Sequence, residues 1–175
     1  MFLYHTIPKG FSGQDIYPLN QLKTIRPDLY SSAAAKYSGR EATMEQVIPF
    51  LGCLWNDVVF LSPIAPNLVV EARREFGLVP GSGKAFVIKS DDLDQNQLVL
   101  YRHRPQWLID RELDKPEYVR FSELADEDKE QLALVPNCAK WSMNKFGAES
   151  LFYGYTPHLL YRGVVNVSGA TILEF

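Results

Sequence analysis

Residues 48–66 read I-P-F-L-G-C-L-W-N-D-V-V-F-L-S-P-I-A-P, with apolar residues on both sides of one polar pair, Asn56 and Asp57. The uninterrupted apolar run at 58–61 predicts a short strand that is covered on both faces. Three prolines, Pro49, Pro63 and Pro66, are expected to end the secondary-structure elements on either side of this run. Trp55 precedes the polar pair, so a Trp-Asn-Asp triplet stands at the mouth of a buried strand. We expect a functional site at this triplet.

The composition is typical of one globular domain. The chain has 175 residues, of which 46% are hydrophobic and 22% are charged. This is enough for a single core, and we expect one domain over 1–175. Aromatic residues make up 13% of the chain, and such residues fill a core or line a pocket for a flat ligand. The formal net charge of -3 gives no global electrostatic case for nucleic-acid binding.

The sequence argues against metal and membrane sites. Its two cysteines and three histidines show no spacing typical of zinc ligands. The N-terminus lacks the pattern of a signal peptide, and no apolar run approaches the ~20 residues that span a bilayer. We therefore expect a soluble cytoplasmic protein without a bound metal and without a membrane partner.

The rest of the chain predicts at least six strands and few helices. Strands are expected at 2–6, 58–61, 85–89, 97–101, 157–167 with a kink at Gly163, and 170–175. Helices are expected at 28–36, 67–76 and 122–134, with a shorter one that starts at 17–22 and ends at Pro27. Residues 102–121 read as an irregular surface insertion. This pattern predicts an α+β domain with a mixed or antiparallel sheet.

His5 stands in the middle of the first predicted strand. Strand alternation places Tyr4 and Thr6 on one face and His5 on the other. A histidine that points into a cleft bonds a ribose hydroxyl or acts as an acid or base. The alternative is a core histidine whose hydrogen bonds are satisfied within the protein.

Asp57 and Arg40 also have two interpretations each. A buried carboxylate needs a partner or a wet cavity. Asp57 is either a structural group that accepts hydrogen bonds from backbone amides at the strand start, or a site residue. Arg40 either pairs locally with Glu41 or holds a phosphate from a loop beside a pocket.

Several short motifs are spread along the chain, namely Tyr4-His5-Thr6, the leucine-containing helix at 19–25, Ile48-Pro49-Phe50, Phe86-Val87-Ile88, Asp92-Leu93 and the late strand at 157–161. Together they resemble the ADP-ribosyltransferase-like fold, and among its members the DNA-base ADP-ribosyltransferase toxins. The chain also resembles uncharacterised bacterial proteins that share a Leu-Trp-Asn-Asp-Val core, here at 54–58.

The resemblance implies a split sheet of about six strands with peripheral helices, and a cleft that binds NAD. It implies that His5 contacts a ribose hydroxyl, that Arg40 meets the pyrophosphate, and that an aromatic ring stacks on the flat base. The implied binding residues are Tyr4, His5, Thr6, Tyr37, Arg40, Trp55 and Asn56. The candidate catalytic residues are His158 and Asp57. His5 and His158 are expected to line one pocket, because their strands are neighbours at the split of the sheet in the fold that the chain resembles.

One departure from the family affects catalysis. The family has a catalytic Glu at the head of the late strand, where this chain has His158. A neutral histidine does not supply the negative charge that stabilises the transition state. Either Asp57 or Glu149 supplies it from elsewhere, or the chain does different chemistry, or it binds without catalysis.

Three functional hypotheses follow. The first is an enzyme that binds NAD or a related nucleotide and transfers ADP-ribose to a protein or nucleic-acid target. The second is a catalytically inactive module that binds a nucleotide or a protein. The third is a protein that binds nucleic-acid ends through Arg102 and Arg104, and the net charge argues against it.

Overall fold

The apolar run at 58–61 forms strand β5 (Val59–Leu61), where two antiparallel sheets meet in a computed structural model that describes residues 1–103 and 117–175. The larger sheet has the order β5-β9-β7-β8, with β9 at Pro157–Tyr161, β7 at Leu98–Arg102 and β8 at Tyr118–Arg120. The smaller sheet has the order β1-β6-β11, with β1 at Phe2–Thr6, β6 at Lys84–Lys89 and β11 at Thr171–Glu174. The expected α+β class with antiparallel pairing is therefore confirmed.

The two sheets are joined at one bridge between β1 and β5. The amide of Tyr4 donates to the carbonyl oxygen of Ser62 at 2.7 Å, and the amide of Ser62 donates to the carbonyl oxygen of Tyr4 at 2.8 Å. No further backbone pair links these strands within the described ranges. The edge of β5 that precedes Ser62 is therefore not covered by a neighbouring strand, and the sheet is split there.

Strand β5 has an apolar environment on both faces, as the sequence predicts. Val59 and Leu61 belong to a core cluster that also contains Leu3 of β1, and both are at most 3% exposed. Phe60 points to the other face and packs in a second cluster with Leu160 of β9. Phe60 itself is only half-buried, so the predicted cover on both faces is complete for Val59 and Leu61 and incomplete for Phe60.

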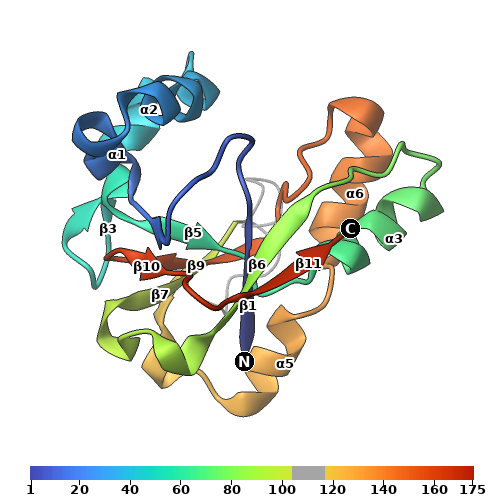
Figure 1. The fold of residues 1–175 in the computed structure, drawn as a ribbon. Coiled ribbons are helices and arrows are strands. Elements are labelled where there is room, and N and C mark those ends of the chain that lie inside the picture. Colours follow the sequence, from blue (N-terminus) through green and yellow to red (C-terminus); the bar gives the residue numbers. More distant parts are fainter. Residues whose placement is uncertain (104–116) are drawn as a thin grey trace.

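Helices α1 (Leu19–Ile25) and α2 (Pro27–Ala34) form an arm that stands over the strands. Neither helix contains a buried residue. The 3-10 turns η1 (Ala35–Tyr37) and η2 (Glu41–Glu45) lead from the arm to the hairpin of β3 (Val47–Ile48) and β4 (Cys53–Leu54). Figure 1 shows this arm on the side of the molecule opposite to α3 and α6.

The remaining elements complete the described chain. Helices α3 (Pro66–Glu75) and α6 (Asn137–Phe146) pack against each other, and α5 (Asp126–Leu132) lies below the strands in Figure 1. Strand β2 (Asp15–Ile16) pairs with β10 (Val165–Asn166). Short 3-10 turns occur at Trp55–Asp57 (η3), Ser90–Asp92 (η4), Gln95–Gln97 (η5), Phe121–Glu123 (η6) and Gly147–Glu149 (η7).

The structure differs from the sequence prediction in the region 102–121. Residues 118–120 form β8 and pair with β7, because Tyr118 and Val119 alternate between the two faces of the larger sheet. The amide of Arg102 also donates to the carbonyl oxygen of Glu117 at 2.8 Å. The prediction of an irregular insertion is therefore wrong for residues 118–120. Residues 104–116 lie outside the described residues.

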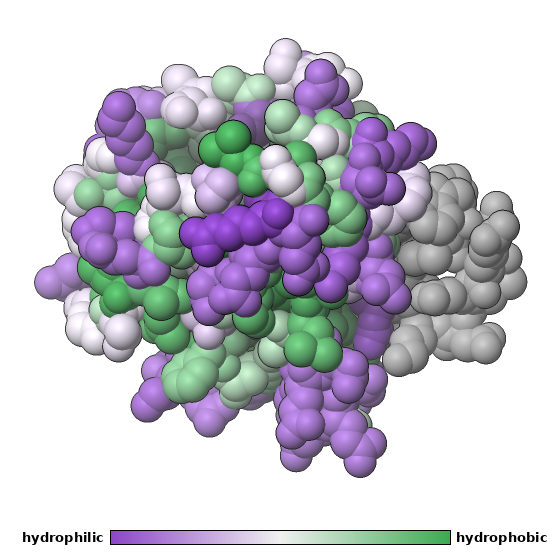
Figure 2. All heavy atoms as spheres, turned by 90° about the vertical axis from the view of Figure 1, so that its right-hand side faces the viewer, coloured by the Kyte–Doolittle hydropathy of each residue, from purple (hydrophilic) through white to green (hydrophobic). Residues whose placement is uncertain are grey.

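The face that carries α3 and α6 has a mixed surface. Figure 2 shows apolar groups on it in separate areas among charged side chains. The exposed apolar residues of the chain include Val79, Leu151 and Ile172. In the described part of the chain, no helix combines the length and the apolar character needed to cross a bilayer.

Candidate functional site

A cavity of about 530 Å³ lies between the strands and the helical arm. Its walls come from the end of β1 and the loop after it, from β2, from α1, α2 and η1, and from η3 with β5. The lining combines aromatic and aliphatic side chains with three cations and one carboxylate. Its members include His5, Lys9, Phe11, Asp15, Tyr17, Leu19, Arg26, Lys36, Tyr37, Trp55, Asn56, Val59 and Phe60.

Two prolines and one arginine position the arm over this cavity. Pro18 precedes α1, and Pro27 occupies the first turn of α2, where its missing amide hydrogen has no cost. Between the helices, the Arg26 guanidinium binds both carboxylate oxygens of Asp28 at 3.0 and 2.8 Å. It also donates to the Ser12 hydroxyl at 3.1 Å. Arg26 thereby ties the loop after β1 to the start of α2.

His5 lies where the two sheets separate. Its Nδ1 atom is 2.9 Å from the carbonyl oxygen of Phe60. Since a carbonyl oxygen only accepts, Nδ1 carries the proton. Burial lowers the pKa of His5, and the charge of Lys36 acts in the same direction. The imidazole is therefore neutral at pH 7, and its Nε2 atom is a hydrogen-bond acceptor.

The Trp-Asn-Asp triplet forms the turn η3 and is fixed from several sides. The Asp57 carboxylate accepts hydrogen bonds from the Leu54 amide at 2.9 Å and from the Asn20 side chain at 2.6 Å. The indole Nε1 of Trp55 donates to the Tyr37 hydroxyl at 3.1 Å. Asp57 thus has the structural role that was one of its two interpretations, and it is not among the described residues that line the cavity.

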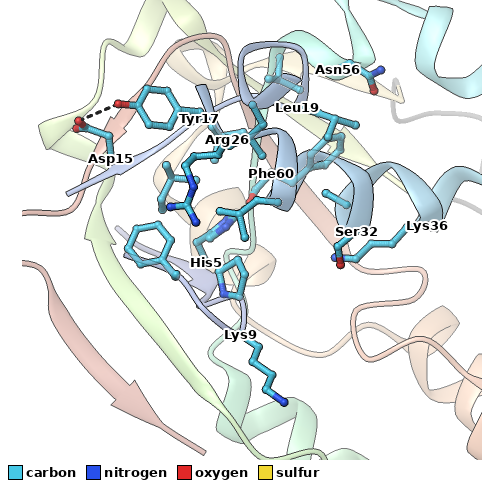
Figure 3. Close-up of a pocket in the computed structure, with 18 of the residues that line it drawn as sticks. His5, Lys9, Asp15, Tyr17, Leu19, Arg26, Ser32, Lys36, Asn56 and Phe60 are labelled. Atoms are coloured by element: carbon cyan, nitrogen blue, oxygen red, sulfur yellow. Dashed lines mark hydrogen bonds between the residues drawn. The ribbon is translucent and has the colours of Figure 1, made fainter. Parts of the chain in front are cut away.

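The cavity has an excess of positive charge. Lys9, Arg26 and Lys36 line it together with one carboxylate, Asp15. Asp15 accepts hydrogen bonds from Asn166 at 2.8 Å and from the Tyr17 hydroxyl at 3.3 Å. Figure 3 shows Lys36 of η1 beside Ser32 of α2, whereas Lys9 extends away from the other labelled side chains. Lys36 has no ion-pair partner among residues 1–103 and 117–175.

The structure brings four of the predicted binding residues to this cavity, namely His5, Tyr37, Trp55 and Asn56. Tyr4 and Thr6 lie on the other face of β1, as strand alternation predicts, and their neighbour there is Tyr153. Arg40 is also not among the described lining residues. Its guanidinium donates to the Lys36 carbonyl oxygen at 2.8 Å and lies 6.0 Å from the Tyr37 ring centre. Glu41, the local partner that one interpretation gave to Arg40, instead accepts a hydrogen bond from the Gly39 amide.

His158 does not share the cavity with His5. Leu160 pairs with Phe60 and Ser62 pairs with Tyr4, so alternation along these strands places His158 on the face of Tyr4, opposite to His5. Its ring lies 6.1 Å from that of Phe60. Burial, with a contribution from His103, lowers the pKa of His158 to about 4. The implied shared pocket of His5 and His158 is therefore not formed.

The remaining candidates lie elsewhere. Glu149 is exposed in η7 and is not among the described lining residues. Arg102 ends β7, and Arg104 lies outside the described residues, so the pair proposed for nucleic-acid ends is not placed. Among the residues that the structure describes, no group of three His, Cys, Asp or Glu side chains is arranged to hold a metal ion.

Sequence reasoning missed Asp15, Arg26 and Lys36. Asp15 reaches the cavity because β2 pairs with β10, which lies 150 residues further along the chain. That pairing has no local signal in a two-residue strand. Arg26 did have a local signal, because it stands next to Pro27 between two short helices. An arginine at this position marks the bend that brings both helices over the strands.

Comparison of the chain with models of known protein families gives no match, and comparisons with curated proteins and with solved structures give none either.

Proposed function

We propose that the chain binds NAD or a related nucleotide in the cavity beneath α1 and α2. The observation that carries this proposal is the composition of the lining, which joins aromatic walls to Lys36, a cation without an ion-pair partner in the described chain, in about 530 Å³. Ligand sites typically enclose roughly 300–1,000 Å³. Aromatic side chains bind flat rings, and lysine and arginine bind phosphates. A nucleotide presents both chemical groups in one molecule.

The described residues give each part of such a ligand a partner. Lys36 is the leading candidate for a phosphate, because it has no ion-pair partner in the described chain while the charge of Arg26 is balanced by Asp28. The Nε2 atom of neutral His5 accepts a hydrogen bond from a ribose hydroxyl. The flat ring lies against the aromatic wall formed by Tyr37 and Trp55.

The site favours binding without turnover. Cleavage of the nicotinamide bond builds positive charge on the ribose, and a nearby carboxylate stabilises it. His158 faces the opposite side of the sheet, and Asp57 is engaged by Leu54 and Asn20. We therefore propose a nucleotide-binding module as the first function.

Transfer of ADP-ribose to a protein or nucleic acid is the second candidate, and Asp15 is the observation that favours it. Asp15 is the one carboxylate among the described lining residues. If it supports catalysis, Asp15→Asn abolishes nicotinamide release and leaves ADP-ribose binding within about threefold. If the wild type releases no nicotinamide above the rate in buffer, the transferase hypothesis is wrong and the binding module stands.

Isothermal titration calorimetry with NAD, ADP-ribose and AMP tests the binding itself. We expect saturable binding of ADP-ribose at one site. Adenosine, which has the base and the ribose but no phosphate, is expected to bind at least tenfold more weakly because it lacks the contact with Lys36. Absence of binding by all three nucleotides would contradict the proposed function.

A further inference from the structure

Asp15 is a carboxylate without an ion-pair partner in the wall of the cavity. It belongs to β2, where its neighbour Ile16 points into the main core cluster, so strand alternation directs the Asp15 side chain away from that core. Asp15 is half-buried and lines the cavity, and no cation pairs with it among residues 1–103 and 117–175. A charge that loses part of its water without gaining an opposite charge favours a ligand that supplies one.

Two side chains hold this carboxylate in place. Its Oδ1 atom accepts a hydrogen bond from the Asn166 side-chain amide at 2.8 Å, and its Oδ2 atom accepts one from the Tyr17 hydroxyl at 3.3 Å. Both donors are neutral, so they fix the position of the carboxylate without cancelling its charge. Each carboxylate oxygen has two lone pairs, so each still has one for a ligand.

The unpaired charges of the described lining lie on opposite sides of the cavity. Figure 3 shows Asp15 on one side of the drawn residues and Lys36 on the other. The other two cations do not neutralise Asp15, because Arg26 pairs with Asp28 at 2.8 Å and Lys9 extends away from the other labelled side chains. The cavity therefore presents a negative charge at one end and a positive charge at the other.

We propose that Asp15 makes the cavity selective for a nucleotide that carries a positive charge at the end remote from its adenine. This inference rests on the proposed nucleotide binding, which gives Tyr37 and Trp55 one flat ring and gives Lys36 a phosphate. Among the nucleotides of that proposal, only those with an oxidised nicotinamide carry such a charge, in the pyridinium ring. The Tyr17 ring lies beside the carboxylate, and aromatic rings attract cations. The preferred ligand class is therefore a dinucleotide with a cationic ring.

The test compares NAD with NADH on the wild type by calorimetry. The two dinucleotides share the adenine, both riboses and both phosphates, and they differ in the charge of the nicotinamide ring. We expect NAD to bind at least tenfold more tightly than NADH, because opposite charges in contact near a protein surface attract each other strongly. The ratio of the two affinities should decrease as salt is added, because salt screens partly exposed charges.

Asp15→Asn is the matching variant, because it removes the charge and keeps the size of the side chain and an oxygen acceptor. It is expected to bind NAD and NADH with affinities within about threefold of each other. A purely structural role of Asp15 would weaken the binding of both ligands alike and leave their ratio unchanged. Asp92→Asn, at an exposed position in η4 that is not among the described lining residues, is the control and is expected to retain the wild-type ratio.

Two results would overturn the role of Asp15 and leave nucleotide binding intact. One is wild-type protein that binds NAD and NADH equally, a result that does not depend on how Asp15→Asn folds. The other is an Asp15→Asn variant that keeps the tenfold preference for NAD. If neither dinucleotide binds and ADP-ribose does not bind either, the proposed nucleotide function fails, and this inference fails with it.

Discussion

The Nδ1 atom of His5 donates to the carbonyl oxygen of Phe60 at 2.9 Å, across the gap between β1 and β5. The Tyr4–Ser62 bridge directs the backbone groups of Ser62 towards β1, and alternate residues of a strand direct theirs to the same edge. The Phe60 carbonyl oxygen therefore points into the split between the sheets, and the imidazole satisfies it. The His5 side chain thus gives Phe60 the hydrogen bond that a paired strand would otherwise supply, and its Nε2 atom remains an acceptor.

Strand β5 is expected to be essential for folding. Val59 is 3% exposed in the main core cluster, and an unpaired buried carboxylate costs several kcal/mol. Val59→Asp should therefore abolish soluble expression, whereas Thr171→Asp, at an exposed position on β11, should express and melt normally. A soluble Val59→Asp protein with a wild-type melting temperature would show that β5 is peripheral.

Asp57 is expected to stabilise the fold rather than to act chemically. Asp57→Ala removes the hydrogen bonds from Leu54 and Asn20, and such bonds to a charged group contribute about 2 kcal/mol. Denaturant unfolding should report a loss of that order. Glu149→Gln, which changes an exposed carboxylate, should leave the unfolding free energy unchanged. A wild-type unfolding free energy in Asp57→Ala would contradict the structural role.

His158 is expected to make stability depend on pH. Its pKa is about 4 in the folded protein, below the ordinary value of 6.5, so the unfolded chain binds more protons between these values. Stability is fully present above pH 6.5 and falls towards pH 4 by up to about 1.4 kcal/mol per pH unit. His158→Asn should show a smaller difference between unfolding free energies at pH 7 and pH 4.5. An equal difference in both proteins would contradict the burial of a neutral His158.

A glutamate at position 158, where the ADP-ribosyltransferase toxins that the sequence resembles have one, is not expected to create an enzyme. His158 lies on the face of the sheet opposite to His5, so the new carboxylate does not reach a ligand in the cavity. His158→Glu should release no more nicotinamide from NAD than the wild type does, and it should be less stable because it buries a carboxylate. A gain in release of tenfold or more would mean that the nucleotide binds on the face of His158.

The class of the fold follows from local signals in the sequence. The run at 58–61 has no polar position, and the sequence therefore predicted a strand that is buried on both faces. In the structure Val59 and Leu61 are buried. The helix predicted at 67–76 appears as α3. By contrast, the sequence did not predict α6, because many aromatic residues stand among the small and polar ones at 137–156. In the structure, Trp141 and Phe146 contact each other on the surface of α6.

The site was predictable only in part. The triplet at 55–57 marked one wall of the cavity, and the alternation of Tyr4, His5 and Thr6 marked another. The roles within the triplet depended on partners distant in sequence, such as Asn20 for Asp57 and Tyr37 for Trp55. The separation of His5 from His158 depended on strand register, which a single sequence leaves undetermined.

The most direct test of nucleotide binding is a calorimetric titration of ADP-ribose into wild-type protein and Lys36→Glu. Lys36 lines the cavity and acts on His5 electrostatically, and a charge-assisted contact with phosphate is worth about 1.5–3 kcal/mol. We predict saturable binding to the wild type and at least tenfold weaker binding to Lys36→Glu. Lys89→Glu, at an exposed position of β6 remote from the lining, should bind like the wild type. Equal affinities in all three proteins, or no binding to the wild type, would contradict the account.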